Sequence, residues 1–117
     1  MSAYLKNTPL AAVSWDVNFH CVQWNKAAEQ MFGYSADETL GRHALELIIP
    51  DGGKEEMNDL LRLLMTQKGG SRNTNENKIK DGSTVICNWY NTVLVNEKGK
   101  GTGIVSLAED ITPRKQA

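Results

Sequence analysis

Apolar and polar positions divide the chain into strands at both ends with helices between them. Residues 11–17 (AAVSWDV) alternate weakly, which predicts a strand with Val13, Trp15 and Val17 on one face. Near the C-terminus, Asp81-Gly82 is a strong hairpin signal. It leads into a long strand, TVICNWYNTVLV, and a second turn, NEKGKG, leads into the last strand, TGIVSLAED.

Residues 20–24 (HCVQW) predict a second strand, in which Val22 and Trp24 share a face. His20 and Cys21 are neighbours on this strand and therefore point to opposite faces. Their imidazole and thiol cannot readily meet as a catalytic dyad. We expect a surface histidine beside a packed thiol.

Capping residues mark the helices that follow. Asn25 is placed to cap a helix over KAAEQMFGY, and Gly33 ends it. Ser35 and Glu38 have the spacing of a capping box, which predicts a short helical turn. A short apolar piece, ALELII, comes next.

Residues 53–67 give the clearest helix of the sequence. Met57, Leu60, Leu61 and Leu64 recur at the spacing of one helical face, and charged residues occupy the other positions. A pair of glycines ends the pattern. Two strands, several helices and a three-strand meander together predict an α+β domain, with an antiparallel sheet and its helices on one side.

Composition narrows the function classes. The chain has 117 residues, 40% hydrophobic and 23% charged, which fits one globular domain. The net charge of -1 lacks the positive excess that is typical of proteins that bind nucleic acid or contact a membrane surface directly, so we expect neither. No stretch reaches the roughly 20 apolar residues of a membrane span, and no signal peptide is recognisable. Cys21 and Cys87 are far apart, which predicts reduced thiols and a cytoplasmic domain.

Catalytic and metal motifs are not recognisable in the sequence. The two cysteines and two histidines lack the spacing of a zinc finger or knuckle. The run GKGTG lacks the pattern of a P-loop and enters a strand, so a hairpin turn explains it better. HExxH and GxSxG do not occur. We therefore expect no catalysis, with Cys87 as the only candidate for a reactive group should the domain be an enzyme.

The long strand instead points to a binding pocket. Alternation places Cys87, Trp89 and Asn91 on one face of it. An asparagine between sheet and helices needs a hydrogen-bond partner, which a ligand, a water or the backbone could supply. Aromatic walls with a few polar groups are typical of small-molecule pockets. They are equally typical of an aromatic core, so both interpretations stay open.

Several segments, in order, resemble a PAS domain with its C-terminal PAC portion. They are WNKAAEQMFGYSADETLG, IIP, KDGS, CNWYNTVLVNEKG and GIVSLAEDIT. The resemblance covers about residue 9 to the end. It implies a five-stranded antiparallel sheet of order 2-1-5-4-3 with helices over one face. It also implies a sensing and dimerising module, commonly found in bacterial histidine kinases and cyclic-di-GMP enzymes.

The resemblance divides the chain into a cap segment (1–8), a sensor domain (9–112) and the start of a helical linker (113–117). In the family, Asp-x-Thr closes the last strand before a linker to an output domain. Asp110 and Thr112 match it, and would hold the junction by hydrogen bonds to the backbone and by capping. Many relatives have Glu where this chain has Pro113, which still suits a first helical position. A frayed tail is the alternative.

Cofactor expectations follow from the same resemblance. Flavin-binding relatives carry a reactive cysteine where this chain reads GRHALELIIP, so flavin adduct chemistry is excluded. Haem-binding relatives use a histidine on the long helix, which has none here, so histidine-ligated haem is not expected. His43 is better explained as a cap or surface group. Trp15 and Trp89 would crowd a non-covalent flavin. A small metabolite of unknown identity, or no ligand, fits better.

The candidate pocket and the candidate dimer face lie on opposite sides of the predicted sheet. The pocket residues are Trp15, Phe32, Leu61, Cys87, Trp89, Asn91, Ser106 and Ala108. The outer face offers Ile86, Tyr90, Val105 and Leu107. Exposed apolar area of this kind usually marks an interface. We expect an isologous homodimer there, joined by the N-terminal segment SAYLKN; coverage by that segment alone is the alternative.

The sequence as a whole therefore predicts a PAS sensor that passes a signal from its cleft to an output domain of the histidine kinase or diguanylate cyclase type. The alternative is a ligand-free module that only holds two output domains in register. Filled interior volume would favour this alternative. An open cavity lined by Asn91 and Ser106 would count against it.

Overall fold

A single antiparallel sheet organises the chain. The computed structural model describes residues 3–66 and 70–112. Five strands form the sheet in the order β2-β1-β5-β4-β3, which confirms the predicted topology. The strands are β1 (Ala11–Trp15), β2 (Cys21–Trp24), β3 (Gly70–Lys78), β4 (Thr84–Val95) and β5 (Gly101–Asp110).

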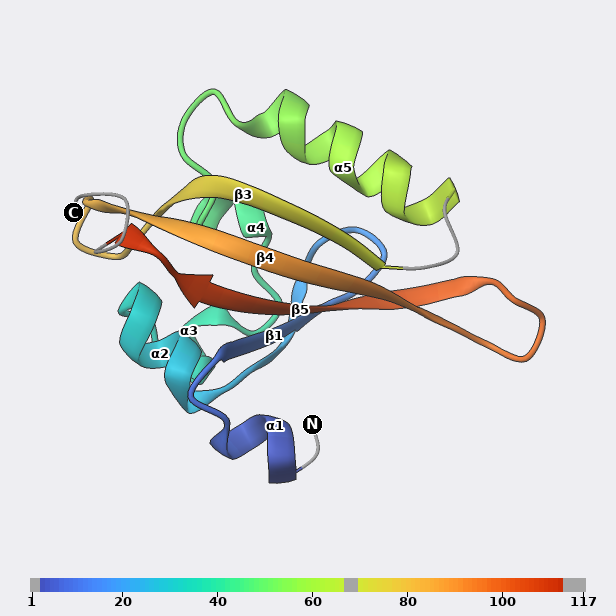
Figure 1. Cartoon of the computed structure of the whole chain (residues 1–117), viewed down its shortest axis with the longest axis horizontal. Helices are drawn as coiled ribbons and strands as arrows, with labels where there is room; N and C mark the ends of the chain where they lie inside the picture. Colours follow the sequence, from blue (N-terminus) through green and yellow to red (C-terminus); the bar gives the residue numbers. More distant parts are fainter. Residues whose placement is uncertain (1–2, 67–69, 113–117) are drawn as a thin grey trace.

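Helices cover one face of this sheet. Figure 1 shows α5 running alongside β3, whereas α2 packs on β1 and α3 on β2. On β4, the side chains of Cys87, Trp89 and Asn91 are buried, and Tyr90 on the opposite face is exposed, as the alternation predicts. The helices are α1 (Ala3–Asn7), α2 (Lys26–Phe32), α3 (Ala36–Thr39), α4 (Ala44–Leu47) and α5 (Lys54–Thr66).

The first strand ends earlier than predicted. All five residues of β1 are buried, but Val17 is 39% exposed and lies in the following turn. Asp16 closes this turn, because its Oδ1 accepts hydrogen bonds from the N–H groups of Asn18 and His20. The prediction that Val17 continues the buried face of the strand was therefore wrong. A carboxylate that binds its own downstream backbone favours a turn over a strand.

The second strand also departs from simple alternation. Val22 is 51% exposed, whereas Trp24 is 6% exposed, so the two side chains do not share an environment. Trp24 is covered by the helices, since its ring packs against Phe32 and its Nε1–H donates to the carbonyl of Tyr34. The pairing of β1 with β2 shifts register before Trp15, which disrupts the alternation of faces.

The predicted caps of α2 and α3 are confirmed. Asn25 Oδ1 accepts from the N–H of Ala28 at the start of α2. Gly33 follows the helix with φ of 83°, a left-handed conformation that favours glycine. Ser35 and Glu38 form the reciprocal capping box of α3.

The long helix α5 faces the core through its first half. Met57 is buried and Leu60 partly buried, whereas Arg62 on the other face is exposed. The helix is described as far as Thr66, and Gly70 of the predicted glycine pair begins β3. The side chains of Leu61 and Leu64 lie outside the described part of the structure, as do Gly69 and the expected linker from Pro113 onward.

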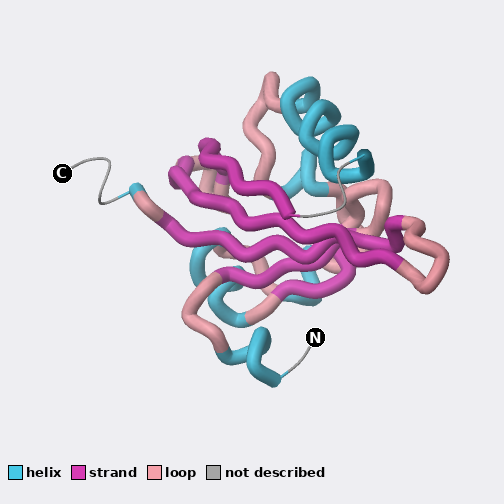
Figure 2. The backbone as a smooth tube through the Cα atoms, turned by 45° about the vertical axis from the view of Figure 1, so that its right-hand side comes forward, coloured by secondary structure: helices cyan, strands magenta, loops and turns pink. Residues whose placement is uncertain are grey.

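The N-terminal helix does not lie over the outer face of β4 and β5. It packs beside α2, near the β1–β2 side of the sheet (Figures 1 and 2). Asn25 holds this helix in place, because the Asn25 Nδ2 donates hydrogen bonds to the carbonyls of Leu5 and Leu10. The expected helix is thus present, but it does not cover the outer face of β4 and β5.

Candidate functional site

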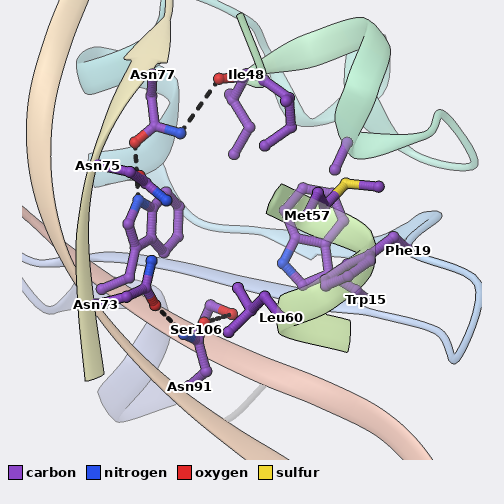
Figure 3. A pocket seen from close by; sticks show the side chains of 13 residues that line it. Trp15, Phe19, Ile48, Met57, Leu60, Asn73, Asn75, Asn77, Asn91 and Ser106 are labelled. Atoms are coloured by element: carbon purple, nitrogen blue, oxygen red, sulfur yellow. Dashed lines mark hydrogen bonds between the residues drawn. The ribbon is translucent and has the colours of Figure 1, made fainter. Parts of the chain in front are cut away.

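A small cavity lies between the inner face of the sheet and the helices. Its volume is about 40 Å³. This holds a few waters, since one water needs about 10–15 Å³. Figure 3 shows its walls: aromatic and aliphatic side chains on one side and a row of carboxamides on the other. It is lined by Trp15, Phe19, Ala44, Ile48, Ile49, Met57, Leu60, Asn73, Asn75, Asn77, Trp89, Asn91 and Ser106.

The carboxamide row comes from β3. Asn73, Asn75 and Asn77 alternate with outward residues, so the pleat directs all three toward the cavity. Asn77 makes hydrogen bonds through both its amide nitrogen and its amide oxygen. Its Nδ2 donates to the carbonyl of Ile48 at 3.2 Å, and its Oδ1 accepts from Trp89 Nε1 at 2.8 Å. Asn77 therefore joins β3, β4 and the end of α4.

A second chain of hydrogen bonds crosses three strands. Asn91 Nδ2 donates to Asn73 Oδ1 at 2.7 Å, and Ser106 Oγ donates to Asn91 Oδ1 at 2.7 Å. Asn91 and Ser106 are both buried. The partner that the sequence left open for Asn91 is thus supplied in part by other side chains of the sheet.

One amide of the row is different. Asn75 Oδ1 is shielded from solvent and has no hydrogen-bond partner, and it is the only such side-chain atom in the described part of the chain. Its position between Asn73 and Asn77 on β3 places it on the cavity wall (Figure 3). An unpaired buried acceptor is costly, so this atom is suited to a ligand or a bound water.

A groove between α5 and β3 adjoins the cavity. Its volume is about 230 Å³, and it shares Ile49, Met57, Leu60, Asn73 and Asn75 with the cavity lining. Cavity and groove together form a cleft from the surface to the inner face of the sheet.

Of the pocket residues expected from the sequence, four line this cavity: Trp15, Trp89, Asn91 and Ser106. Phe32, Cys87 and Ala108 do not line it and belong to the adjoining core. Phe32 lies parallel to Trp89, with ring centroids 6.0 Å apart. The side chain of Leu61 is outside the described part of the chain.

Sequence reasoning missed the side of the cavity that β3 forms. The run NTNENK alternates asparagine with other polar residues, so neither face reads as apolar and the hydrophobic pattern that marks a half-buried strand is lost. The signal that was present is the recurrence of asparagine at every second position, 73, 75 and 77. Phe19 and Met57 on the opposite wall were equally outside the predicted set.

Cys87 lacks the character of a nucleophile. Its thiol is completely buried, and burial, reinforced by the charge of Asp110, raises its pKa to about 12. The pKa of Cys21 is also raised by burial. Both cysteines are free, and the described residues contain no group of three or more histidine, cysteine or acidic side chains placed to hold a metal.

Asp110 and Thr112 hold the end of β5 as expected. Asp110 Oδ1 accepts from the N–H of Thr112 at 2.9 Å, and Thr112 Oγ1 accepts from the N–H of Ile86 at 2.8 Å. The N–H of Ile111 donates to the carbonyl of Ile86. These bonds fasten the chain after β5 to the start of β4; the linker itself lies outside the described residues.

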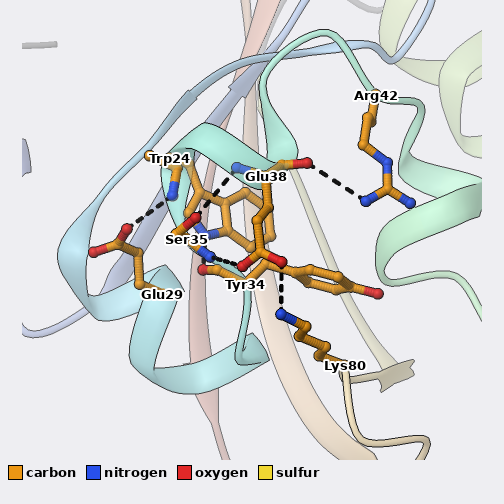
Figure 4. A network of polar contacts seen from close by, with 8 residues as sticks. Trp24, Glu29, Tyr34, Ser35, Glu38, Arg42 and Lys80 are labelled. Carbon is orange, nitrogen blue, oxygen red and sulfur yellow. Dashed lines mark hydrogen bonds and ion pairs between the residues drawn. The ribbon is translucent and has the colours of Figure 1, made fainter.

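A polar cluster outside the cavity fixes the helices to the β3–β4 hairpin (Figure 4). Glu38 accepts from Lys80 Nζ at 2.6 Å and from the N–H of Ser35 at 2.8 Å. The hydrogen bond from Lys80 is the main cause that lowers the pKa of Glu38. Lys80 also lies over the ring of Tyr34. This solvent-exposed cluster is a structural clamp.

The outer face of the sheet carries the expected apolar residues. Tyr90 is 39% exposed, and Ile86, Val105 and Leu107 are partly exposed. Arg72 of β3 lies over the ring of Tyr90, 5.4 Å from its centroid. No helix within the described residues is long and apolar enough to cross a membrane.

Comparison with protein families gives one match over nearly the whole chain. The family model described as the PAS fold matches residues 1–111. No curated protein matches the chain.

Solved structures agree with the family match at the level of the fold. A PAS domain from Colwellia psychrerythraea has a TM-score of 0.88 at 21% identity, over 95% of this chain and 93% of the other. An RNA-binding light-oxygen-voltage receptor has a TM-score of 0.84 at 22% identity, over 96% of this chain but 32% of the other. VqmA of Vibrio cholerae, in complex with a ligand and DNA, has a TM-score of 0.78 at 20% identity, over 94% of this chain and 50% of the other. This chain thus spans a third to a half of the latter two.

Proposed function

The chain belongs to the PAS family, a family of sensory domains, and on that premise we propose that it binds a small molecule in the cleft between α5, β3 and the inner sheet face. Binding in the cleft shifts the balance between two packings of the sheet. The ligand acts only through its different affinity for the two packings. The domain has no catalysis of its own in this proposal.

The observation that carries the proposal is the cavity wall formed by β3. Three carboxamides face the cavity together with Trp15 and Phe19, and Asn75 Oδ1 has no partner in the protein. A core that served only stability would gain from an apolar residue at position 75, because the unpaired amide oxygen costs about 1–3 kcal/mol. Aromatic walls with a few convergent polar groups are characteristic of ligand sites.

The path of the signal follows the strands that line the site. Trp89 and Asn91 lie on β4 and Ser106 lies on β5, the strand that ends at Asp110. Thr112 is bonded to the start of β4 through Ile86. We infer that a change in the pairing of β4 and β5 is passed to whatever follows Thr112. A histidine kinase or a diguanylate cyclase is the output we propose.

Two further features complete the proposal. A homodimer through the outer face of β4 and β5 is supported by the partly exposed Ile86, Tyr90, Val105 and Leu107. A cytoplasmic location is supported by the two free buried thiols, since reduced cysteines are usual in that compartment.

Mass spectrometry of the purified protein tests ligand binding directly. Native and denatured spectra of one sample are compared, together with its absorbance spectrum. An extra mass that is released on denaturation supports the proposal. Absorbance in the visible range would indicate a bound flavin or haem. Equal masses in both spectra, together with no change in Tm on adding a small-molecule library, would contradict it.

The second candidate function is a dimerising module without a ligand. It is favoured by the small volume of the inner cavity, about 40 Å³, compared with about 300–1,000 Å³ for drug-sized sites. The rings of Phe32 and Trp89 fill the neighbouring interior. Under this alternative, an apolar substitution at Asn75 would stabilise the protein with no loss of signalling in the full-length protein.

A further inference from the structure

The chemistry of the cleft restricts the ligand that it can hold. Resting on the function proposed above, we propose that Asn75 is the hydrogen-bond anchor for a ligand that enters between α5 and β3. The inner end of this ligand is uncharged and donates a hydrogen bond, and anionic ligands are rejected.

Among the residues that the structure describes, no ionisable side chain lines the inner cavity. Its lining consists of aliphatic and aromatic residues, four asparagines and one serine. A charge moved from water into this space would have no opposite charge to compensate its lost hydration. The part of a ligand that reaches the cavity is therefore neutral.

The amides other than Asn75 are already engaged. Asn77 uses both its oxygen and its nitrogen, and the oxygens of Asn73 and Asn91 both accept from neighbouring side chains. Asn75 Oδ1 is the buried acceptor without a partner. The group that it lacks is a donor, so a ligand N–H or O–H completes the row. The rings of Trp15 and Phe19 supply the apolar wall opposite.

The mouth of the cleft carries negative charge. Glu56 of α5 lines the groove, and among the described residues no lysine, arginine or histidine lines it. Glu76 of β3 also borders the groove, but it alternates with Asn75 and Asn77 and is directed to the other face of the strand. The Glu56 carboxylate is exposed, so its contribution is modest. An anion is thus disfavoured at the entrance as well as in the cavity, whereas a neutral or cationic outer end is accepted.

Cavity and groove together set the size of the ligand. The inner cavity of about 40 Å³ accepts only a few atoms, and the adjoining groove of about 230 Å³ accepts the remainder. Asn75 lines both. A compact ring with one amide-like substituent spans the two volumes with its donor at Asn75 Oδ1.

Three benzene derivatives of similar shape separate donor capacity from charge. Benzamide is neutral and donates through its amide, N,N-dimethylbenzamide is neutral without a donor, and benzoate is anionic without a donor. Their binding is followed by NMR at the indole N–H signals of Trp15 and Trp89 and the side-chain amide signals of Asn75. We expect benzamide to bind with roughly tenfold lower Kd, about 1.4 kcal/mol, than either of the others. Equal binding of benzoate would overturn the proposal.

A matched pair of variants separates a ligand anchor from a structural residue. Asn75→Leu removes the unpaired oxygen, whereas Asn77→Leu, two residues along the same face, leaves Trp89 Nε1 without its acceptor and removes one of the two hydrogen bonds to the carbonyl of Ile48. We expect N75L to raise the Tm of the free protein and to abolish the preference for benzamide, and N77L to lower the Tm. A lower Tm for N75L, or benzamide binding that N75L leaves unchanged, would overturn the proposal.

The outcomes also distinguish this inference from the proposed function. If native mass spectrometry finds a bound molecule that is anionic, the domain binds a ligand but the chemistry assigned to Asn75 is wrong. If it finds none and no probe binds, both the function and the inference fail.

Discussion

The indole Nε1–H of Trp89 donates to Asn77 Oδ1 at 2.8 Å in the interior of the protein. Asn77 Nδ2 donates in turn to the carbonyl of Ile48, which follows α4. A side-chain bridge thus runs from β4 through β3 to the helical layer. Trp24 makes a comparable bond to the carbonyl of Tyr34 at 3.1 Å, but there the bond is only part-buried.

Substitution of each of these two tryptophans by phenylalanine measures how much the buried and the part-buried indole hydrogen bond contribute to stability. Both side chains are nearly fully buried, so W89F and W24F lose similar ring volume. W89F additionally leaves Asn77 Oδ1 buried without a partner, which costs about 1–3 kcal/mol, whereas the bond that W24F removes is only part-buried. We expect W89F to lower the free energy of unfolding in urea by about 1 kcal/mol more than W24F. Equal losses would show that the bridge adds nothing beyond packing.

The junction after β5 gives a second prediction. Thr112→Val keeps the shape of the side chain but removes the oxygen that accepts from the N–H of Ile86. The lost bond should cost about 0.5–1.5 kcal/mol, and hydrogen exchange at the Ile86 amide should become faster. Thr102→Val is the control, because its hydroxyl donates to the carbonyl of Leu94 in an exposed hairpin. If Ile86 exchanges no faster in T112V, Thr112 does not hold the junction.

Local signals in the sequence were sufficient for most of the fold. Asn25 and Gly33 bound α2 as predicted because capping depends on a few adjacent residues. The run 84–95 forms β4 over its full length because its alternation continues through Cys87, Trp89 and Asn91. Elements specified by neighbouring residues could therefore be predicted.

Features that depend on distant contacts could not be predicted. Half of the cavity wall comes from β3, where asparagine replaces the apolar residues that normally mark an inner face. Its amides are tolerated because Trp89, Ile48 and Asn91 supply partners, and those partners become visible only in three dimensions. The position of α1 beside α2 likewise depends on hydrogen bonds from Asn25, a residue 20 positions away from Leu5.

His43 predicts a dependence of stability on pH. Its ring lies 5.2 Å from that of His20, and its Nδ1 accepts from the N–H of Leu45 as the N-cap of α4. Burial lowers the pKa of His43, and the charge of His20 lowers it further, while Glu46 and Asp16 oppose this weakly. The folded protein therefore binds this proton less readily than the unfolded chain. Stability should fall as the pH decreases below about 6.5, until the pH passes the lowered pKa of the folded state.

His43→Asn tests this assignment, since asparagine is a good N-cap that does not titrate. Urea unfolding between about pH 5 and pH 7 should show a smaller pH dependence in H43N, because Asp and Glu side chains titrate mainly at lower pH. In H20N, the pKa of His43 measured by NMR should rise. An unchanged pH dependence in H43N would assign the effect to another group.

The thiols give a prediction about reactivity. Because the pKa of Cys87 is raised to about 12 and its side chain is buried, little reactive thiolate is present near neutral pH. Iodoacetamide should label Cys87 and Cys21 far more slowly in the native protein than in urea. Rapid and selective labelling of native Cys87 would instead support an enzymatic role for this residue.

The outer sheet face predicts the oligomeric state. If two copies meet through β4 and β5, Tyr90 lies in the interface, and Tyr90→Lys places a cation on each side of it next to Arg72. Like charges brought together in an interface oppose association, so the dimer Kd measured by sedimentation should increase by roughly tenfold or more. Val22→Lys is the matched control on β2, where the exposed valine lies away from this face. A dimer that Y90K leaves intact but V22K disrupts would move the interface to the β2 edge.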